Sequence, residues 1–160
     1  MKKLYIMIGV SGSGKSTRSR EIARYHLDKG ENVYILSADD YWIMLGRGYY
    51  HYQASRIGEA HLWNLRRFKN AIDDSSDKII IIDNTNLERR SMDKYAMAAY
   101  QVGYEVEPVI IKPVDNHIMW ERNSHSVPYE TICKMTEKYK LLVENMKRYG
   151  SFRGFIHGKD

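Results

Sequence analysis

The chain of 160 residues contains a single cysteine, Cys133, so no disulfide bond can form within it. Scarcity of cysteine is typical of proteins that work in a reducing compartment. The sequence also lacks any apolar run near the ~20 residues that a membrane-spanning helix requires. We therefore expect a cytoplasmic protein that makes no membrane contact.

Repeats and low-complexity linkers are absent as well, and the length suits one domain with a core of its own. We expect a single domain over residues 1–149 and a short C-terminal tail over residues 150–160. The six histidines are scattered, without the spacing of a transition-metal site. No nucleophile elbow is present, and the sequence does not indicate an oligomeric state.

Basic residues are in moderate excess. The chain has 25 Lys and Arg against 20 Asp and Glu, a net charge of +5 and a pI near 9.2. This charge suits a polyanionic partner such as a nucleic acid. It fits a solvated basic surface equally well, so charge alone does not identify a partner.

Short apolar runs alternate with stretches of helical periodicity. The apolar runs cover residues 4–8, 32–36, 78–82 and 104–111, and the helical stretches cover residues 15–29, 54–74, 88–102, 115–123 and 129–149. This alternation predicts an α/β fold, a parallel sheet of four to five strands with helices on both faces. Ligands in such folds bind beyond the carboxyl ends of the strands, so the residues there are the candidates for function.

The first predicted strand leads into residues 9–17, which fit the P-loop pattern G-x-x-x-x-G-K-[ST]. The N–H groups of such a loop and the positive end of the next helix bind phosphate. We expect Lys15 to reach the β- and γ-phosphates of ATP, and Ser16 to bind Mg²⁺. The residues assigned to ATP are Ser11, Gly12, Ser13, Gly14, Lys15, Ser16 and Thr17. The pattern therefore predicts a P-loop NTPase fold with ATP and Mg²⁺; a glycine turn that binds nothing is the alternative.

Acidic residues follow the next two predicted strands. Asp39 and Asp40 end the second strand, where a carboxylate near the γ-phosphate can accept the proton of an attacking hydroxyl. We assign this base role to Asp39; the alternative is that either residue caps the next helix. Asp83 ends the third strand in the arrangement of a Walker B acid, and we expect it to hold Mg²⁺ through water together with Ser16.

Polar segments near the other strand ends complete the expected site. Arg122 lies between two predicted helices, and we expect it to close over the triphosphate as part of a helical lid and to neutralise charge that develops during transfer. A surface arginine is the alternative. His125 in the same segment can touch the nucleotide or cap the lid. Thr85 and Asn86 offer short polar groups at the cleft, or form a turn.

Aromatic and basic residues are candidates for binding the phosphate acceptor. Tyr49, Tyr50 and Tyr52 follow a glycine-containing segment and can stack on exposed bases. Basic residues that can track a phosphate backbone are Arg56, Arg66, Arg67, Lys69, Arg89 and Arg90. The alternative is that the tyrosines pack a small insertion and that the arginines lie on solvated helix faces.

Taken together, these motifs resemble the polynucleotide-kinase-like P-loop kinases. The kinase domain of phage polynucleotide kinase shares the P-loop sequence, the Asp-Asp-Tyr at residues 39–41, and residues 85–90 and 122–124. The small P-loop domains of animal ubiquitin-ligase-binding proteins are similar at residues 59–64, 81–87 and 122–127. Motif order and spacing agree over about residues 2–143.

The resemblance implies an ATP-dependent kinase that acts on a nucleic-acid hydroxyl, most simply a 5′-hydroxyl end of DNA or RNA. Its catalytic residues would be Lys15, Asp39 and Arg122. Thr85 would lie near the acceptor, and the other residues that we assign to the acceptor side are Asp40, Asn86 and Arg89.

The chain departs from the phage kinase on the acceptor side. Trp42 stands where that kinase has an arginine, and the segment at residues 123–128 is shorter and lacks a second lid arginine. Other acceptors therefore stay open: a small molecule, a nucleoside or the hydroxyl of a modified DNA base. A nucleotide-dependent binding module without catalysis is a further alternative, although such a module needs no base at Asp39.

Overall fold

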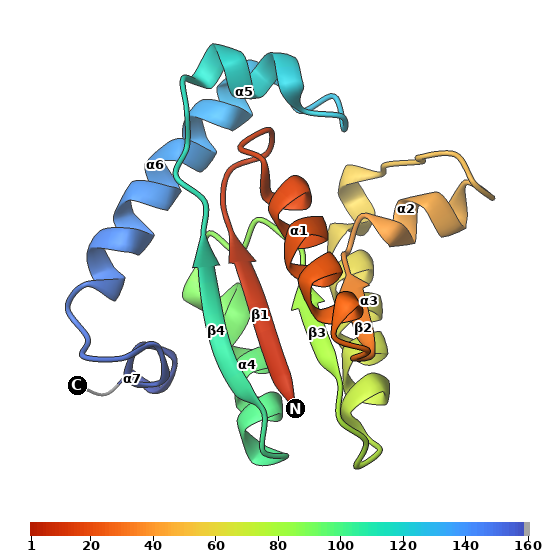
Figure 1. Cartoon of the computed structure of the whole chain (residues 1–160). Helices are drawn as coiled ribbons and strands as arrows, with labels where there is room; N and C mark the ends of the chain where they lie inside the picture. Colours follow the sequence, from red (N-terminus) through yellow and green to blue (C-terminus); the bar gives the residue numbers. More distant parts are fainter. Residues whose placement is uncertain (159–160) are drawn as a thin grey trace.

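A parallel sheet with the strand order β2-β3-β1-β4 lies at the centre of the computed structural model, which describes residues 1–158 (Figure 1). The strands are β1 (Lys3–Ile8), β2 (Val33–Leu36), β3 (Ile79–Ile82) and β4 (Glu105–Ile110). β1 and β3 are the most deeply buried because they occupy the middle of the sheet. The predicted α/β P-loop fold is confirmed, with four strands in the described residues.

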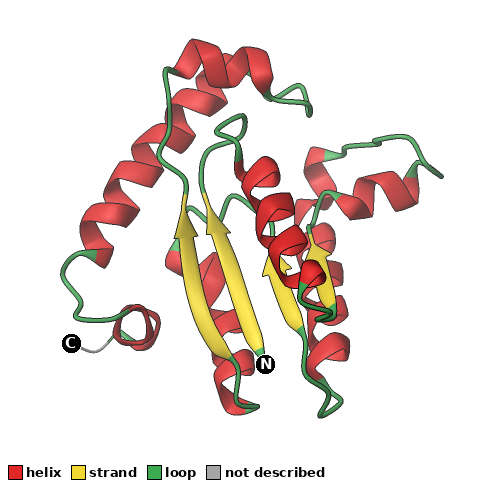
Figure 2. Ribbon diagram, viewed as in Figure 1, coloured by secondary structure: helices red, strands yellow, loops and turns green. Residues whose placement is uncertain are grey.

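Helices cover both faces of the sheet (Figure 2). Helix α1 (Lys15–Asp28) packs on one face, and helices α3 (Ile57–Ile72) and α4 (Arg89–Gln101) pack on the other. Side chains alternate along a strand, so Ile6 and Ile80 face α3 and α4 whereas Met7 and Ile81 face α1. The unbroken apolar runs in the sequence follow from this burial on two faces.

The remaining elements complete the described chain. Helix α2 (Asp40–Leu45) follows β2, and a 3₁₀ turn (Ala54–Arg56) precedes α3. Helices α5 (Asn116–Arg122) and α6 (Tyr129–Met146) follow β4, and α7 (Phe152–His157) comes last. Helices α2 and α7 were not expected, because six residues are too few to show helical periodicity. In the described residues, no helix combines the length and apolar character needed to cross a bilayer.

The C-terminal segment contributes to the main core. Phe155 and Ile156 of α7 are buried in the cluster that contains β1, β3 and α4, and Tyr149 packs edge-on against Phe155 with ring centroids 5.6 Å apart. Residues 150–158 of the expected tail are thus seen here, and residues 159–160 lie outside the described residues.

Replacing Phe155 by alanine tests this packing. The side chain is fully buried, so its loss should lower the free energy of unfolding by about 3–5 kcal/mol. Urea unfolding followed by tryptophan fluorescence measures the change. Leu141→Ala is the control, since Leu141 is 67% exposed and its loss should stay within about 0.5 kcal/mol. Equal stability of the two variants would show that α7 does not dock on the core.

Candidate functional site

A cavity of about 700 Å³ opens at the carboxyl ends of the strands. Its walls come from the P-loop, the turn between β2 and α2, the residues after β3, and residues 122–125 after α5. The lining includes these residues expected from the sequence: Ser11, Gly12, Gly14, Lys15, Ser16, Thr17, Asp39, Asp40, Asp83, Thr85 and Arg122. The structure thus brings the candidate donor side and the candidate base into one cavity.

The P-loop passes directly from β1 into α1. The N–H of Ser13 donates to the carbonyl of Val10 at 3.0 Å, and Ser13 itself is buried beneath the loop rather than in the cavity wall. The first N–H bond of α1 runs from Arg18 to the carbonyl of Gly14 at 3.1 Å. The N–H groups before Arg18 therefore lie at the positive end of a 14-residue helix, which is the arrangement that binds phosphate.

Lys15, Ser16 and Asp83 meet at the floor of the cavity. The Ser16 hydroxyl donates to Oδ2 of Asp83 at 3.0 Å, and Nζ of Lys15 lies 3.4 Å from the carbonyl of Val10. Burial raises the pKa of Asp83 and lowers that of Lys15, and the attraction between the two charges opposes both shifts. Oδ1 of Asp83 is buried without a hydrogen-bond partner among the described residues. A free carboxylate oxygen beside a hydroxyl fits the oxygen ligands of Mg²⁺.

The adjacent acids Asp39 and Asp40 point to different partners. The carboxylate of Asp40 pairs with the guanidinium of Arg67 at 2.8 Å. Oδ1 of Asp39 accepts a hydrogen bond from the hydroxyl of Tyr50 at 3.1 Å, and Oδ2 lies 3.3 Å from Nε2 of His125. Asp39 occupies the N-cap position of α2, yet its side chain makes no capping hydrogen bond. Its carboxylate is therefore directed to the cavity and its walls.

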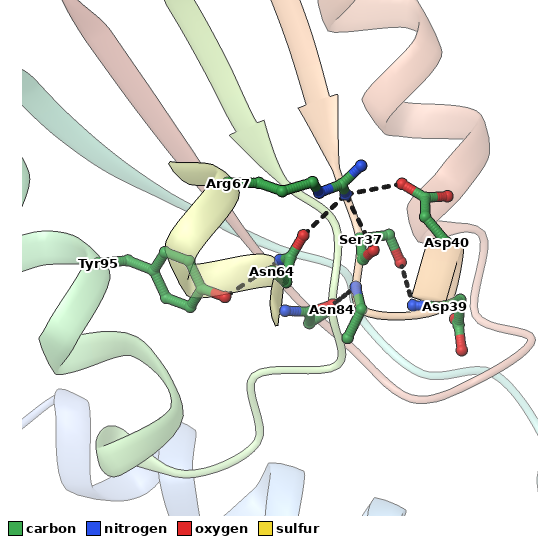
Figure 3. A network of polar contacts seen from close by, with 8 residues as sticks. Ser37, Asp39, Asp40, Asn64, Arg67, Asn84 and Tyr95 are labelled. Carbon is green, nitrogen blue, oxygen red and sulfur yellow. Dashed lines mark hydrogen bonds and ion pairs between the residues drawn. The ribbon is translucent and has the colours of Figure 1, made fainter. Parts of the chain in front are cut away.

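A polar network holds the turn that carries these acids (Figure 3). A single terminal nitrogen of Arg67 donates to the carbonyl of Ser37 at 3.2 Å, to Asp40 at 2.8 Å and to Oδ1 of Asn64 at 2.8 Å. The amide of Asn64, which is buried, donates to the hydroxyl of Tyr95 at 3.0 Å. Helices α3 and α4 thus fix the position of the turn after β2.

The residues after β3 tie the strand ends together. Oδ1 of Asn84 accepts from the N–H of Ala38 at 2.9 Å. Nδ2 of Asn86 donates to the carbonyl of Met7 at 2.7 Å, and the carbonyl of Thr85 accepts from Gly9 at 3.0 Å. Asn86 is buried with a φ of 50°, a conformation that asparagine tolerates. The structure therefore gives Asn86 a place in the scaffold, away from the cavity where we expected it.

Arg89 also lies away from the cavity. It is the first residue of α4, and its guanidinium lies 6.0 Å from the ring centroid of Phe155 in α7. Its direction follows from the docking of α7 beside α4, which the sequence did not indicate.

Several residues of the site have contacts that were not expected from the sequence, although Tyr50, Arg67 and His125 were considered for other roles. Arg20 and Asn84 line the cavity, Tyr50 and His125 reach Asp39, and Arg67 holds Asp40. Only Arg67 had a signal that could have been used. Its partner Asn64 interrupts the apolar side of its helix, and a polar residue in such a position needs a hydrogen-bond partner nearby.

The lid helix α5 rests directly on the P-loop. A Cβ atom added to Gly12 would lie 2.1 Å from the carbonyl oxygen of Met119, and Gly12 has a φ of 83°. Arg122 ends α5 and lines the cavity. Beyond it, Oδ1 of Asn123 accepts from the N–H of Val127 at 2.8 Å, which closes residues 123–127 into a loop, here called the lid loop.

Gly12→Ala should lower the affinity for ATP at least about tenfold, equivalent to about 1.4 kcal/mol. The added methyl group would collide with the backbone of α5 and require a φ that alanine rarely adopts. Titration calorimetry with ATP and Mg²⁺ measures the effect. Gly58→Ala is the matched control, because a Cβ at Gly58 in α3 meets nothing within 4 Å. Unchanged affinity in Gly12→Ala would mean that the contact with α5 does not shape the nucleotide site.

Comparison with known proteins shows where the sequence belongs. Residues 4–141 match the AAA domain family. NEDD4-binding protein 2 from Homo sapiens is 36% identical over 143 residues, which cover 88% of this chain and 8% of that protein. The chain thus spans only a small part of this much longer relative. The match shows a shared family, and it does not assign the activity of the whole relative to this chain.

Two solved structures share the fold. A chain of the Pnkp1/Rnl/Hen1 RNA repair complex superposes with a TM-score of 0.65 at 19% identity, over 89% of this chain and 45% of that one. A gluconokinase from Sinorhizobium meliloti 1021 has a TM-score of 0.53 at 18% identity, over 86% and 74% of the two chains. At such identities the likeness shows the fold alone. The family match confirms the P-loop assignment made from the motifs: the chain belongs to the AAA domain family, whose P-loop fold generally binds a nucleotide with Mg²⁺.

Proposed function

We propose that this domain transfers the γ-phosphate of ATP to a hydroxyl group of a nucleic acid, most simply a 5′-hydroxyl end. The observation that carries the proposal is the position of the Asp39 carboxylate, which lines the same cavity as Lys15 and the Ser16–Asp83 pair. A site that only bound nucleotide would need no further carboxylate besides Asp83 in this cavity. The half-buried, unpaired Cys133 suits the reducing cytoplasm as its location.

The donor side of this proposal uses positive charge and backbone N–H groups. Lys15 contacts the β- and γ-phosphates, and Arg122 approaches them from the lid. Ser16 and Asp83 hold Mg²⁺, which when bound neutralises charge on the phosphate oxygens. Partial burial of Lys15 and Asp83 strengthens the interactions of these two side chains, whose pKa values are shifted by desolvation.

The acceptor side uses Asp39 as general base. The acceptor oxygen attacks the γ-phosphorus as the bond to the β–γ bridging oxygen breaks, and its proton passes to Asp39. Both oxygens of that carboxylate already have partners, Tyr50 at 3.1 Å and His125 at 3.3 Å. Each oxygen keeps a second lone pair for the acceptor hydroxyl, and of the two partners His125 makes the longer contact.

Two features favour a nucleic acid as the acceptor. Tyr49 and Tyr52 are more than half exposed, beside the turn that carries Asp39, and exposed rings bind single-stranded bases by stacking. The chain also has a net charge of +5. Some of the arginines considered for the phosphate backbone have internal partners, since Arg56 pairs with Glu59 and Arg67 with Asp40.

A small molecule, a nucleoside or a modified-base hydroxyl in DNA is the second candidate acceptor. The observation in its favour is the size of the cavity, about 700 Å³, which is within the range that encloses a small ligand. The fold likeness to a gluconokinase is compatible with this alternative but does not select it.

A panel of acceptors separates these candidates. The protein is incubated with γ-labelled ATP, Mg²⁺ and 5′-hydroxyl DNA, 5′-hydroxyl RNA, nucleosides or sugars. We expect label on an oligonucleotide end, with binding that weakens steeply as salt increases because phosphate contacts release counterions. Label on a nucleoside or sugar but on no oligonucleotide would select the second candidate.

Asp39→Asn tests the base. The amide is nearly the same size but cannot take up the proton, so transfer should fall by about 10²–10⁴-fold while ATP affinity is kept. Lys15→Ala should lose both transfer and ATP affinity, because it removes a phosphate contact. Asp28→Asn, at the far end of α1, is the control and should match the wild type. Undiminished transfer in Asp39→Asn would remove Asp39 from the mechanism.

A further inference from the structure

Residues 46–53 form an exposed loop, here called the aromatic arm, that follows α2 and projects from the body of the domain (Figure 1). Tyr49 is 82% exposed and Tyr52 is 51% exposed, so the arm is not packed as a small core of its own. Its shape is nevertheless defined. The N–H of His51 donates to the carbonyl of Trp42 at 3.1 Å, and a Cβ at Gly46 would lie 1.8 Å from the carbonyl oxygen of Tyr49.

Three rings from two distant segments line up at the base of this arm. The imidazole of His125, from the lid loop, stacks on Tyr50 with ring centroids 4.5 Å apart and planes 25° apart. The rings of Tyr50 and Tyr52 are parallel within 2°, with centroids 6.5 Å apart. Trp42 supports Tyr52 edge-on at 5.3 Å. Ring contacts therefore connect the lid loop, through Tyr50, to the rest of the arm.

The two stacked side chains, Tyr50 and His125, also contact the Asp39 carboxylate. Tyr50 donates to Oδ1 at 3.1 Å, and burial beside this carboxylate raises the pKa of Tyr50, which keeps the hydroxyl protonated as a donor. Nε2 of His125 lies 3.3 Å from Oδ2. One side chain of the lid loop thus covers both a face of Tyr50 and an oxygen of the candidate base. Moving it exposes the two together.

We propose that the face of Tyr50 now covered by His125 binds the nucleobase of the acceptor's terminal nucleotide. The base replaces the imidazole on Tyr50, and the hydroxyl to be phosphorylated replaces Nε2 at Asp39. Stacking then places the acceptor hydroxyl at the carboxylate only when a base is present, so the terminal base is a determinant of specificity. This proposal rests on the proposed function, since it names the part of a nucleic-acid acceptor that the site recognises.

The test compares two 5′-hydroxyl oligonucleotides that differ only at the terminal nucleotide, which either carries its base or is abasic. The wild type should phosphorylate the end with a base at least about tenfold more efficiently in kcat/KM, as expected for the loss of one stacked base. Tyr50→Leu should abolish this preference. Tyr50→Phe should keep it, because the ring is retained, while transfer to both ends falls for want of the hydroxyl at Asp39.

His125→Ala provides a second, opposite signal. Both ends gain the freed oxygen of Asp39, but only the end with a base gains the uncovered face of Tyr50, so KM should fall more for that end than for the abasic end. Tyr25→Leu is the matched control, because Tyr25 is an exposed tyrosine on α1 that contacts Lys29 rather than the cavity. The preference of this variant for the end with a base should equal that of the wild type.

The outcomes separate this proposal from the proposed function. If the wild type phosphorylates both ends equally, or if Tyr50→Leu keeps the preference, Tyr50 does not bind the base although the domain is a polynucleotide kinase. If no oligonucleotide is phosphorylated, the proposed function itself fails. Should Tyr50→Leu not fold, His125→Ala and the wild-type comparison still decide, since a KM that changes by the same factor for both ends in His125→Ala would overturn the proposal.

Discussion

The carboxyl ends of β1 and β3 are bonded side by side, through the carbonyl of Thr85 to the N–H of Gly9 and through Asn86 to the carbonyl of Met7. These two bonds determine how the P-loop, which continues β1, meets the acid that ends β3. The Ser16–Asp83 contact follows from this register. A shift of one residue between the strands would reverse which side chains face each helix layer and separate the pair. The buried side chain of Asn86 therefore matters for the site although it does not line the cavity.

The acceptor side of the site depends on the different partners of the adjacent acids Asp39 and Asp40. Arg67 pairs with the Asp40 carboxylate, and the same guanidinium nitrogen also donates to the carbonyl of Ser37 and to Oδ1 of Asn64. Asp39 is left to the cavity. Because the network joins β2, α3 and α4, the position of the candidate base is set by the same packing that forms the core. Two adjacent carboxylates thus have different surroundings: Asp40 fixes the turn through Arg67, and Asp39 lines the cavity.

The sequence predicted well what depends on short stretches of chain. Strands and long helices follow from periodicity, and the P-loop residues and Asp83 follow from local motifs at strand ends. Contacts between side chains that lie far apart in the sequence could not be predicted from it. Asn86 and Arg89 sit one to four residues from cavity residues, yet each turns away toward a partner fixed by tertiary packing, Met7 and Phe155. Arg67 had only the indirect signal of Asn64 in its own helix, and nothing local showed that Tyr50 and His125, which lie far apart in the sequence, would stack. Short helices such as α2 lack the turns that reveal a period.

The close approach of Gly12 to Met119 bears on how a nucleotide enters and leaves the cavity. Helix α5 already touches the P-loop backbone, so it has no further distance to travel when a nucleotide arrives. We expect the opening and closing of the site to fall to the lid loop, residues 123–127, whose ends Asn123 joins. Movement of a few loop residues is faster than closure of a whole domain. In such an arrangement a nucleotide can enter and leave by movement of the lid loop while α5 stays on the P-loop.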